Sequence, residues 1–224
     1  MAVRTMNPVQ PPPGCSVIEI GPQRLAAFLG IPDEAQGIVI FAHGSGSGRL
    51  SPRNNYVAQR LRDAGFATLL LDLLSPQEER DRSNVFDIDL LAARLGQAAD
   101  WVEDDPETKN LRIGYFGAST GAGAALRAAA EDPRIRAIVS RGGRADMAGR
   151  NALALVDAPT LLIVGSRDDI VIDLNQAAFG VMRCVRELAI VPGASHLFEE
   201  PGTLDEVVEL AIGWFRKHLG DPGT

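Results

Sequence analysis

The stretch LRIGYFGASTGAGAALRAAAED, residues 111–132, has the pattern of a strand, a sharp turn and a helix. Leu111 to Phe116 are mostly apolar, Ala122 to Ala130 favour a helix, and Ser119 stands between them with glycine two positions away on each side. Bulky residues in place of these glycines would clash with the strand and the helix around a strained serine. The pattern therefore predicts a turn that presents Ser119 at a helix N-terminus, where free N–H groups bind developing negative charge.

The rest of the chain alternates between strand and helix patterns. Helices are predicted from Tyr56 to Ala64, along an apolar stripe from Ile88 to Val102, and from Asp173 to Met182. A closing helix is expected to begin with Thr203 as N-cap and Glu206 as its capping-box partner. Further strand patterns cover Ser16 to Ile20, Leu25 to Leu29, Gly37 to Ala42, Ala67 to Leu71, Ile135 to Val139, Pro159 to Val164 and Val185 to Val191. This alternation predicts an α/β fold with a mostly parallel sheet flanked by helices on both faces.

Length and composition limit the kind of protein. The chain has 224 residues, enough for one domain with a substantial core. We expect the proline-rich residues 1–14 to form a flexible lead-in and residues 15–224 to form a single domain. A net charge of −7 argues against nucleic acid or an anionic membrane as the main partner, because phosphate binding needs a basic patch.

Several other classes of protein find no support in the sequence. No apolar run approaches the roughly 18 residues of a membrane span, and the first residues lack the apolar centre of a signal peptide. Cys15 and Cys184 make no disulfide framework, and no Cys/His cluster suggests a metal. We therefore expect a cytoplasmic protein with no metal and no cofactor, and the sequence leaves monomer and homodimer open.

A glycine-rich loop, His43-Gly44-Ser45-Gly46-Ser47-Gly48, directly follows the buried strand pattern from Gly37 to Ala42. Open α/β sheets place their ligands at such carboxyl ends of strands. The spacing matches neither G-x-x-x-x-G-K-[ST] nor G-x-G-x-x-G, so a phosphate cradle is disfavoured. The loop is better suited to supply a backbone N–H group to an oxyanion.

A serine hydroxyl needs a base to act as a nucleophile, and the chain offers three histidines. His218 lies in the apolar stripe of the last helix, where a packing role is favoured. His43 precedes the glycine-rich loop and is expected to brace it. His196 follows the last predicted strand, at the sheet edge expected for Ser119, and is the best candidate for the base.

An acidic residue must orient that base. Asp168 and Asp169 follow the strand pattern from Pro159 to Val164 within a few residues, and Asp146 follows the preceding strand at a greater distance. Asp168 is preferred, and the order Ser119, Asp168, His196 then matches a known triad arrangement. The oxyanion donors are expected to be the backbone N–H groups of Thr120 and Ser45.

These motifs resemble those of the α/β-hydrolases, and within them the dienelactone-hydrolase-like group of small serine hydrolases. The resemblance covers roughly Ile38 to Leu219 and rests on HGSGSG, GASTG, the segment from Gly193 to His196, and G-x-x-D-x-x-V at Gly165, Asp168 and Val171. It implies an eight-stranded, mostly parallel sheet, with the first strand missing or reduced here and little or no cap. It also implies Ser119, Asp168 and His196 as nucleophile, acid and base. The sequence departs from dienelactone hydrolases proper, which use a cysteine nucleophile, and a haloalkane dehalogenase would need an aspartate there.

The sequence thus predicts a serine hydrolase for small soluble carboxylic esters or lactones, acting through an acyl-enzyme on Ser119. A thioesterase, amidase or acyltransferase would use the same triad, and a non-catalytic binding module of this fold is a further alternative. Two questions remain at the mouth of the site. The polar segment 73–84 is a solvated loop or a small cap, with the loop favoured. Four arginines after strands, Arg49, Arg53, Arg141 and Arg144, are surface residues or anchors for an anionic substrate group, with the surface role favoured.

Overall fold

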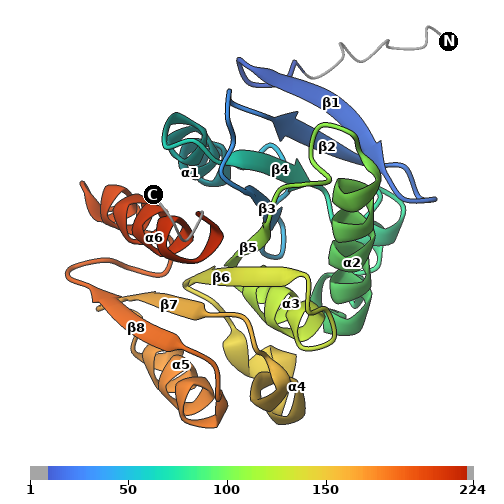
Figure 1. Cartoon of the computed structure of the whole chain (residues 1–224). Helices are drawn as coiled ribbons and strands as arrows, with labels where there is room; N and C mark the ends of the chain where they lie inside the picture. The colour runs from blue at the N-terminus through green and yellow to red at the C-terminus, as the bar shows by residue number, and fades with distance from the viewer. Residues whose placement is uncertain (1–9, 221–224) are drawn as a thin grey trace, which may run out of the picture.

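Eight strands form one sheet within residues 10–220, the part of the chain that the computed structural model describes (Figure 1). Their order is β1-β2-β4-β3-β5-β6-β7-β8. Strand β2 is antiparallel to β1 and to β4, and every other neighbouring pair is parallel. The strands are β1 (Cys15–Ile20), β2 (Leu25–Gly30), β3 (Ile38–Ala42), β4 (Ala67–Leu71), β5 (Ile113–Ala118), β6 (Ile135–Arg141), β7 (Thr160–Gly165) and β8 (Arg186–Val191). The predicted mostly parallel sheet is confirmed. The expected loss of the first strand is wrong, because the β1–β2 hairpin completes the sheet edge.

Helices cover both faces of the sheet (Figure 1). Helices α1 (Pro52–Asp63) and α6 (Thr203–Leu219) pack on one face. The opposite face carries α2 (Ile88–Asp104), α3 (Thr120–Ala129), α4 (Arg150–Leu155) and α5 (Asp169–Val181). Three short 3-10 turns, η1 (Glu78–Arg80), η2 (Asn84–Phe86) and η3 (Ala145–Ala148), lie in the connections. None of the helices within residues 10–220 is both long and apolar enough to cross a membrane.

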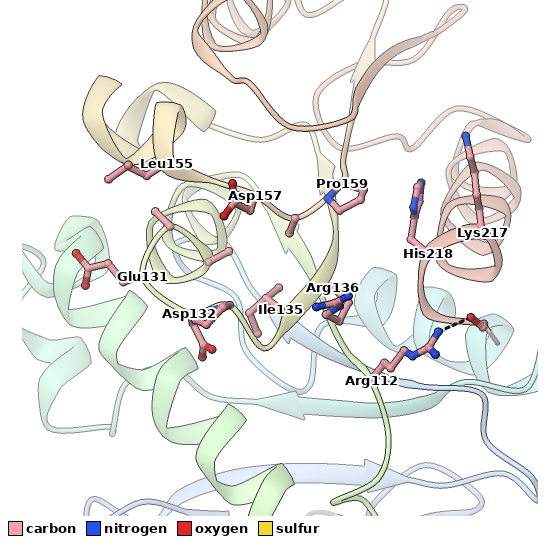
Figure 2. Close-up of a pocket in the computed structure, with 15 residues that line it drawn as sticks. Arg112, Glu131, Asp132, Ile135, Arg136, Leu155, Asp157, Pro159, Lys217 and His218 are labelled. Atoms are coloured by element: carbon pink, nitrogen blue, oxygen red, sulfur yellow. Dashed lines mark hydrogen bonds between the residues drawn. The ribbon is translucent and has the colours of Figure 1, made fainter. Parts of the chain in front are cut away.

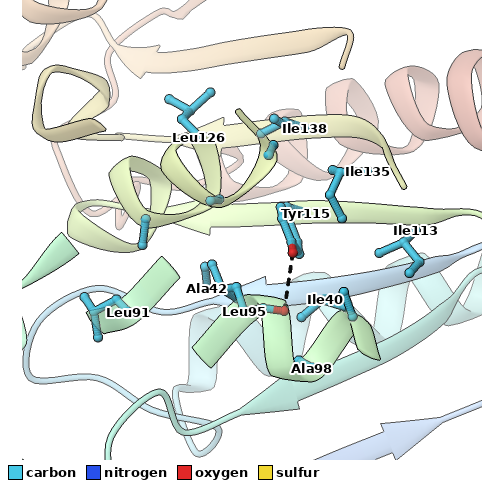
Figure 3. Packing of buried hydrophobic residues seen from close by; sticks show 14 of the residues in the cluster. Ile40, Ala42, Leu91, Leu95, Ala98, Ile113, Tyr115, Leu126, Ile135 and Ile138 are labelled. Carbon is cyan, nitrogen blue, oxygen red and sulfur yellow. Dashed lines mark hydrogen bonds between the residues drawn. The ribbon is translucent and has the colours of Figure 1, made fainter. Parts of the chain in front are cut away.

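The central strands are buried on both faces, which explains their continuous apolar runs. Tyr115 of β5 shows how a polar atom is accommodated there (Figure 3). Its ring is fully buried, and its hydroxyl donates a hydrogen bond to the Leu95 carbonyl of α2 at 3.3 Å. A buried phenol hydroxyl with a partner avoids the free-energy penalty of an unpaired polar group. Burial also raises the pKa of Tyr115, so this side chain stays neutral.

The direction of the chain across the sheet reverses between β3 and β5. From β3 the chain crosses through α1 to β4 on one side, and then returns through α2 to β5 on the other side of β3. Ligands of open α/β sheets bind at such a switch point, outside the carboxyl ends of the strands. The fold therefore places its crevice between the segment after β3 and the turn after β5, which contains Ser119.

Two helices begin earlier than predicted. Helix α1 begins at Pro52 rather than Tyr56, because the Ser51 side chain caps it by accepting from the Asn54 N–H at 3.4 Å and a proline fits the first turn. Helix α5 begins at Asp169 rather than Asp173. The first turn of α1 is too polar to belong to an apolar stripe, so periodicity alone misses it, whereas the first turn of α5 is mostly apolar and continues the helix toward its N-terminus.

The expected capping box at Thr203 is wrong. Gly202, with φ of 80°, occupies the N-cap position, and Thr203 is already the first helical residue. The Thr203 hydroxyl donates to the Glu200 carbonyl at 2.8 Å and does not cap the N–H of Glu206. Helix α4 and turn η3 are additions that the sequence did not predict. The segment 73–84 contains η1 and the first residue of η2, in agreement with a loop.

Candidate active site

Ser119 lies at the junction of β5 and α3 in a strained backbone conformation, with φ of 50° and ψ of −124°. Such a conformation is rare for a residue with a side chain, and it persists only where the surroundings impose it. The flanking glycines allow it. A methyl group at Gly117 would lie 2.5 Å from Ala122 Cα, and one at Gly121 would lie 2.5 Å from the His43 carbonyl oxygen and closer still to that of Ala42. The steric reason predicted for G-x-S-x-G thus agrees with the packing.

The glycine-rich loop after β3 lies against this turn. A methyl group at Gly44 would approach Ser119 Cβ to 3.0 Å. The Ser45 N–H donates a hydrogen bond to Thr120 Oγ1 at 3.0 Å, so the two candidate oxyanion donors belong to adjacent backbone segments. Thr120 is the first residue of α3, and its N–H therefore has no acceptor within the helix. An oxyanion at this place would have to replace the Thr120 hydroxyl as the acceptor for Ser45.

His43 holds the loop in place. Its Nε2 accepts from the Leu73 N–H at 2.9 Å, and its Nδ1 is 3.0 Å from the Gly44 carbonyl oxygen. These partners fix the tautomer with the proton on Nδ1. Burial lowers the pKa of His43, which favours this neutral form. Because both ring nitrogens are engaged, His43 holds the glycine-rich loop in place and does not serve as the base.

Asp168 and His196 meet at the carboxyl edge of the sheet. Asp168 follows β7 and occupies the N-cap position of α5 without a side-chain capping bond, while His196 lies in the loop after β8. Asp168 Oδ2 is 2.6 Å from His196 Nδ1, which leaves Nε2 as the free ring nitrogen. The Asp168 side chain is 16% exposed and the His196 side chain 38%, so the pair is buried at its acidic end and open at the imidazole. Asp146, one of the alternatives, instead pairs with Arg144 at 2.8 Å.

His196 and Ser119 approach the end of β6 from its two sides. The Ser119 N–H is 3.4 Å from the Arg141 carbonyl oxygen, and a methyl group at the next residue, Gly142, would lie 3.0 Å from the His196 carbonyl oxygen. No hydrogen bond joins Ser119 Oγ to His196 within residues 10–220. Catalytic hydrogen bonds are often long in unliganded enzymes and shorten when substrate binds. The structure therefore gathers all five predicted site residues at one edge.

Two hollows lie at opposite edges of the sheet. One of about 440 Å³ lies beside the candidate oxyanion hole, between the glycine-rich loop and the segment around η1 and η2. Its walls come from Ser45, Gly46, Ser47, Glu79, Arg82, Val85 and Phe86. The other, of about 650 Å³, lies where β5 and β6 begin (Figure 2). The larger hollow is thus remote from Ser119, and the smaller one adjoins the glycine-rich loop at Ser45.

His218 lines the hollow at the amino ends of the strands (Figure 2). Its ring packs on Trp214 with centroids 4.4 Å apart, and burial lowers its pKa. Its Nε2 has no hydrogen-bond partner in the part of the chain that the structure describes. Histidine in this environment contributes packing area rather than proton transfer, as its position in the apolar stripe predicted. Among residues 10–220, no group of three or more His, Cys, Asp or Glu side chains is placed to hold a metal ion.

The four arginines around the site differ in their partners. Arg49 pairs with Asp72, Arg53 with Glu199 at 2.9 Å, and Arg144 with Asp146. Arg141 has no such partner. It is 8% exposed, and its Nε and Nη1 are buried without a hydrogen bond to any of residues 10–220. Sequence reasoning treated the four alike, and the available signal was a charged residue close behind the apolar run from Ala137 to Val139.

An eight-stranded, mostly parallel sheet with a strained serine turn at its switch point is the architecture of an α/β-hydrolase. A family model described as PET hydrolase-like matches residues 37–223. The chain belongs to this family, and within the α/β-hydrolases to the dienelactone-hydrolase-like group.

Solved structures agree with this assignment. The crystal structure of a dienelactone hydrolase from Anabaena variabilis is 54% identical, covers 91% of this chain and 96% of its own, and superposes with a TM-score of 0.87. Est1E from Butyrivibrio proteoclasticus shares the fold with a TM-score of 0.76 at 17% identity, over 91% of this chain and 98% of its own.

Curated relatives add a longer context. A Mycobacterium tuberculosis protein named "Putative phosphoribosyl transferase" is 60% identical over 205 residues, which are 91% of this chain and 46% of that protein. The chain therefore spans about half the length of that relative. A protein from Bradyrhizobium named as a 2-oxo-3-(5-oxofuran-2-ylidene)propanoate lactonase is 31% identical over 167 residues, which are 64% of this chain and 66% of that protein.

Proposed function

We propose that this chain is a serine hydrolase of small carboxylic esters or lactones. The observation that carries the proposal is the Asp168–His196 hydrogen bond of 2.6 Å at the same sheet edge as Ser119. A buried carboxylate on Nδ1 fixes the tautomer and orientation that make Nε2 a base. The names of the similar dienelactone hydrolase and lactonase proteins support the same class of reaction.

The mechanism has two half-reactions, and in each of them His196 first takes a proton and then returns it. Ser119 Oγ attacks the ester carbonyl while His196 takes the hydroxyl proton, and Asp168 stabilises the imidazolium. The N–H groups of Thr120 and Ser45 hold the oxyanion of the tetrahedral intermediate. The intermediate expels the alcohol, which receives the proton from His196. Water then attacks the acyl-enzyme, with His196 again as base, and releases the acid and free Ser119.

The name of the Mycobacterium relative raises phosphoribosyl transfer as another activity. This chain matches only 46% of that protein's length, and the matched region is the hydrolase family region. Nucleophile, base, acid and oxyanion donors together suit acyl chemistry, so we assign the ester or lactone hydrolase activity to this region.

The test is turnover of 4-nitrophenyl acetate and butyrate, together with a six-membered aryl lactone. Ser119→Ala should lower kcat/KM by about 10⁴-fold or more, and Ser16→Ala on the edge strand β1 should leave it unchanged. A thioester, an anilide and an added alcohol acceptor in the same panel separate thioesterase, amidase and acyltransferase activity. Equal turnover by wild type and Ser119→Ala, or none by the folded wild type, would refute the proposal and favour a binding module.

A further inference from the structure

Arg141 ends β6 as a buried cation without a counter-charge. Its side chain makes no ion pair and no hydrogen bond to any part of residues 10–220, and two of its nitrogens are sealed from solvent. It lies on the sheet face covered by α1 and α6, because Ala137 and Val139, four and two positions earlier, pack in that core. Arg141 therefore lies between an apolar core and the edge of the sheet that carries the candidate active site.

This arrangement is unfavourable for the free protein. Buried charges are normally paired, and an uncompensated one lowers stability. Burial, together with the smaller effect of the nearby positive charge of Arg53, lowers the pKa of Arg141 to about 10. At neutral pH the guanidinium still carries its charge. The presence of a buried charge that destabilises the fold is explained if an anion binds to it during function.

The position of Arg141 indicates which molecule brings that anion. Arg141 is the register partner of Ala118, the residue before the nucleophile, and its carbonyl oxygen is the acceptor 3.4 Å from the Ser119 N–H. The next residue, Gly142, adjoins His196. The Arg141 backbone therefore adjoins both the serine turn and the His196 loop, and its side chain starts beside the position of the carbonyl that Ser119 would attack.

We propose that Arg141 binds a carboxylate or phosphate group of the substrate and gives the enzyme a preference for anionic esters. The proposal rests on the hydrolase function and adds the charge of its substrate. A guanidinium donates charge-assisted hydrogen bonds to either oxyanion, and Nη2 is the one of its three nitrogens that is not sealed. The neighbouring Arg49, Arg53 and Arg144 already have carboxylate partners, which leaves Arg141 as the available cation.

The experiment compares esters that differ only in charge. On the acyl side, mono-4-nitrophenyl adipate is compared with its methyl ester. On the alcohol side, 4-acetoxybenzoate and 4-acetoxyphenyl phosphate are compared with methyl 4-acetoxybenzoate, which separates carboxylate from phosphate. Wild type should prefer at least one anionic ester over its neutral match. Arg141→Met should lower that ratio of kcat/KM values by about 10- to 100-fold, as expected for hydrogen bonds to a charged group.

Two further variants control the result. Arg136→Met changes the same residue type at the exposed amino end of the same strand, and it should leave the ratio unchanged. Arg141→Lys keeps the charge but loses the fork, so its ratio should fall between those of wild type and Arg141→Met. Arg141→Met should also raise the Tm of the free protein. Replacement of an arginine that only stabilised the fold would lower it.

The outcomes separate this proposal from the hydrolase function. If wild type turns over neutral esters through Ser119 but shows no anion preference on either side, or keeps that preference in Arg141→Met, Arg141 is not the anchor and the hydrolase function stands. If no ester is turned over, the hydrolase function fails. Thermal stabilisation by adipate or 4-hydroxybenzoate, present in wild type and absent in Arg141→Met, would then still support anion binding, and its absence would overturn it.

Discussion

Replacing Gly121 by alanine tests the close packing that brings the serine turn to the glycine-rich loop. The new methyl group would lie 2.5 Å from the His43 carbonyl oxygen and closer still to that of Ala42. Both acceptors are backbone atoms, and the end of β3 is fixed by its pairing with β5, where Ala42 faces Gly117. Neither carbonyl can rotate away as a flexible side chain would, so α3 or the loop must move.

The expected cost follows from that geometry. Overpacking a rigid core position typically lowers stability by about 1–3 kcal/mol. In a chain of 224 residues, 1 kcal/mol corresponds to a Tm change of about 2–4 °C, so Gly121→Ala should lose roughly 2–12 °C. The same movement separates Ser119 from Ser45, and a displacement of about 1 Å costs on the order of 100-fold in rate.

Gly96→Ala is the matched control, because it introduces the same methyl group where nothing lies within 4 Å, in the middle of α2. It should raise stability by about 0.5–1 kcal/mol through helix propensity and leave esterase activity unchanged. Thermal and urea unfolding followed by circular dichroism measure both variants. Wild-type stability and activity in Gly121→Ala, or destabilisation of similar size in Gly96→Ala, would refute this account of the turn.

Two further predictions concern the histidines and their partners. Asp168→Asn should lower kcat by about 10⁴-fold through loss of the correct His196 tautomer. Asp169→Asn, one residue later in the first turn of α5, should change it less than about threefold, and similar losses in both would contradict the assignment of the acid. Burial lowers the pKa of His43 in the folded protein below its ordinary value of about 6.5. At a pH between this lowered pKa and 6.5, the unfolded chain therefore binds more protons than the folded protein. Stability should therefore fall as pH drops through about 6.5, and His43→Gln should show a smaller fall between pH 7.5 and 5.5 in urea titrations, whereas parallel curves would contradict this reading.

The parts of the fold that the sequence predicts are those with strong local signals. The turn at Ser119 needs glycine at two positions for steric reasons, and the strand before it needs apolar residues on both faces. His43 and His218 were assigned to bracing and packing from the patterns around them, and their contacts agree. In each case a local constraint fixes the residue type.

Features that depend on tertiary contacts were missed. Helix α4 has six residues and is too short to show a stripe, so its formation depends on packing against α3 and α5. Thr203 matched a capping box, but the glycine before it adopts the positive φ that ends the loop there. The isolation of Arg141 cannot be inferred from sequence, because it depends on whether the residues that surround it within 10–220 provide a hydrogen-bond or ion-pair partner.

The central claim is that Ser119 is an activated nucleophile. Intact-mass spectrometry after incubation with a fluorophosphonate probe tests it without knowledge of the substrate. The account predicts one adduct on wild type, located at Ser119 by peptide mapping, and none on folded Ser119→Ala. Labelling should be slowed in His196→Gln, because the hydroxyl then lacks its base. A folded wild-type protein that gains no adduct, or that gains one equally in Ser119→Ala, would contradict the claim.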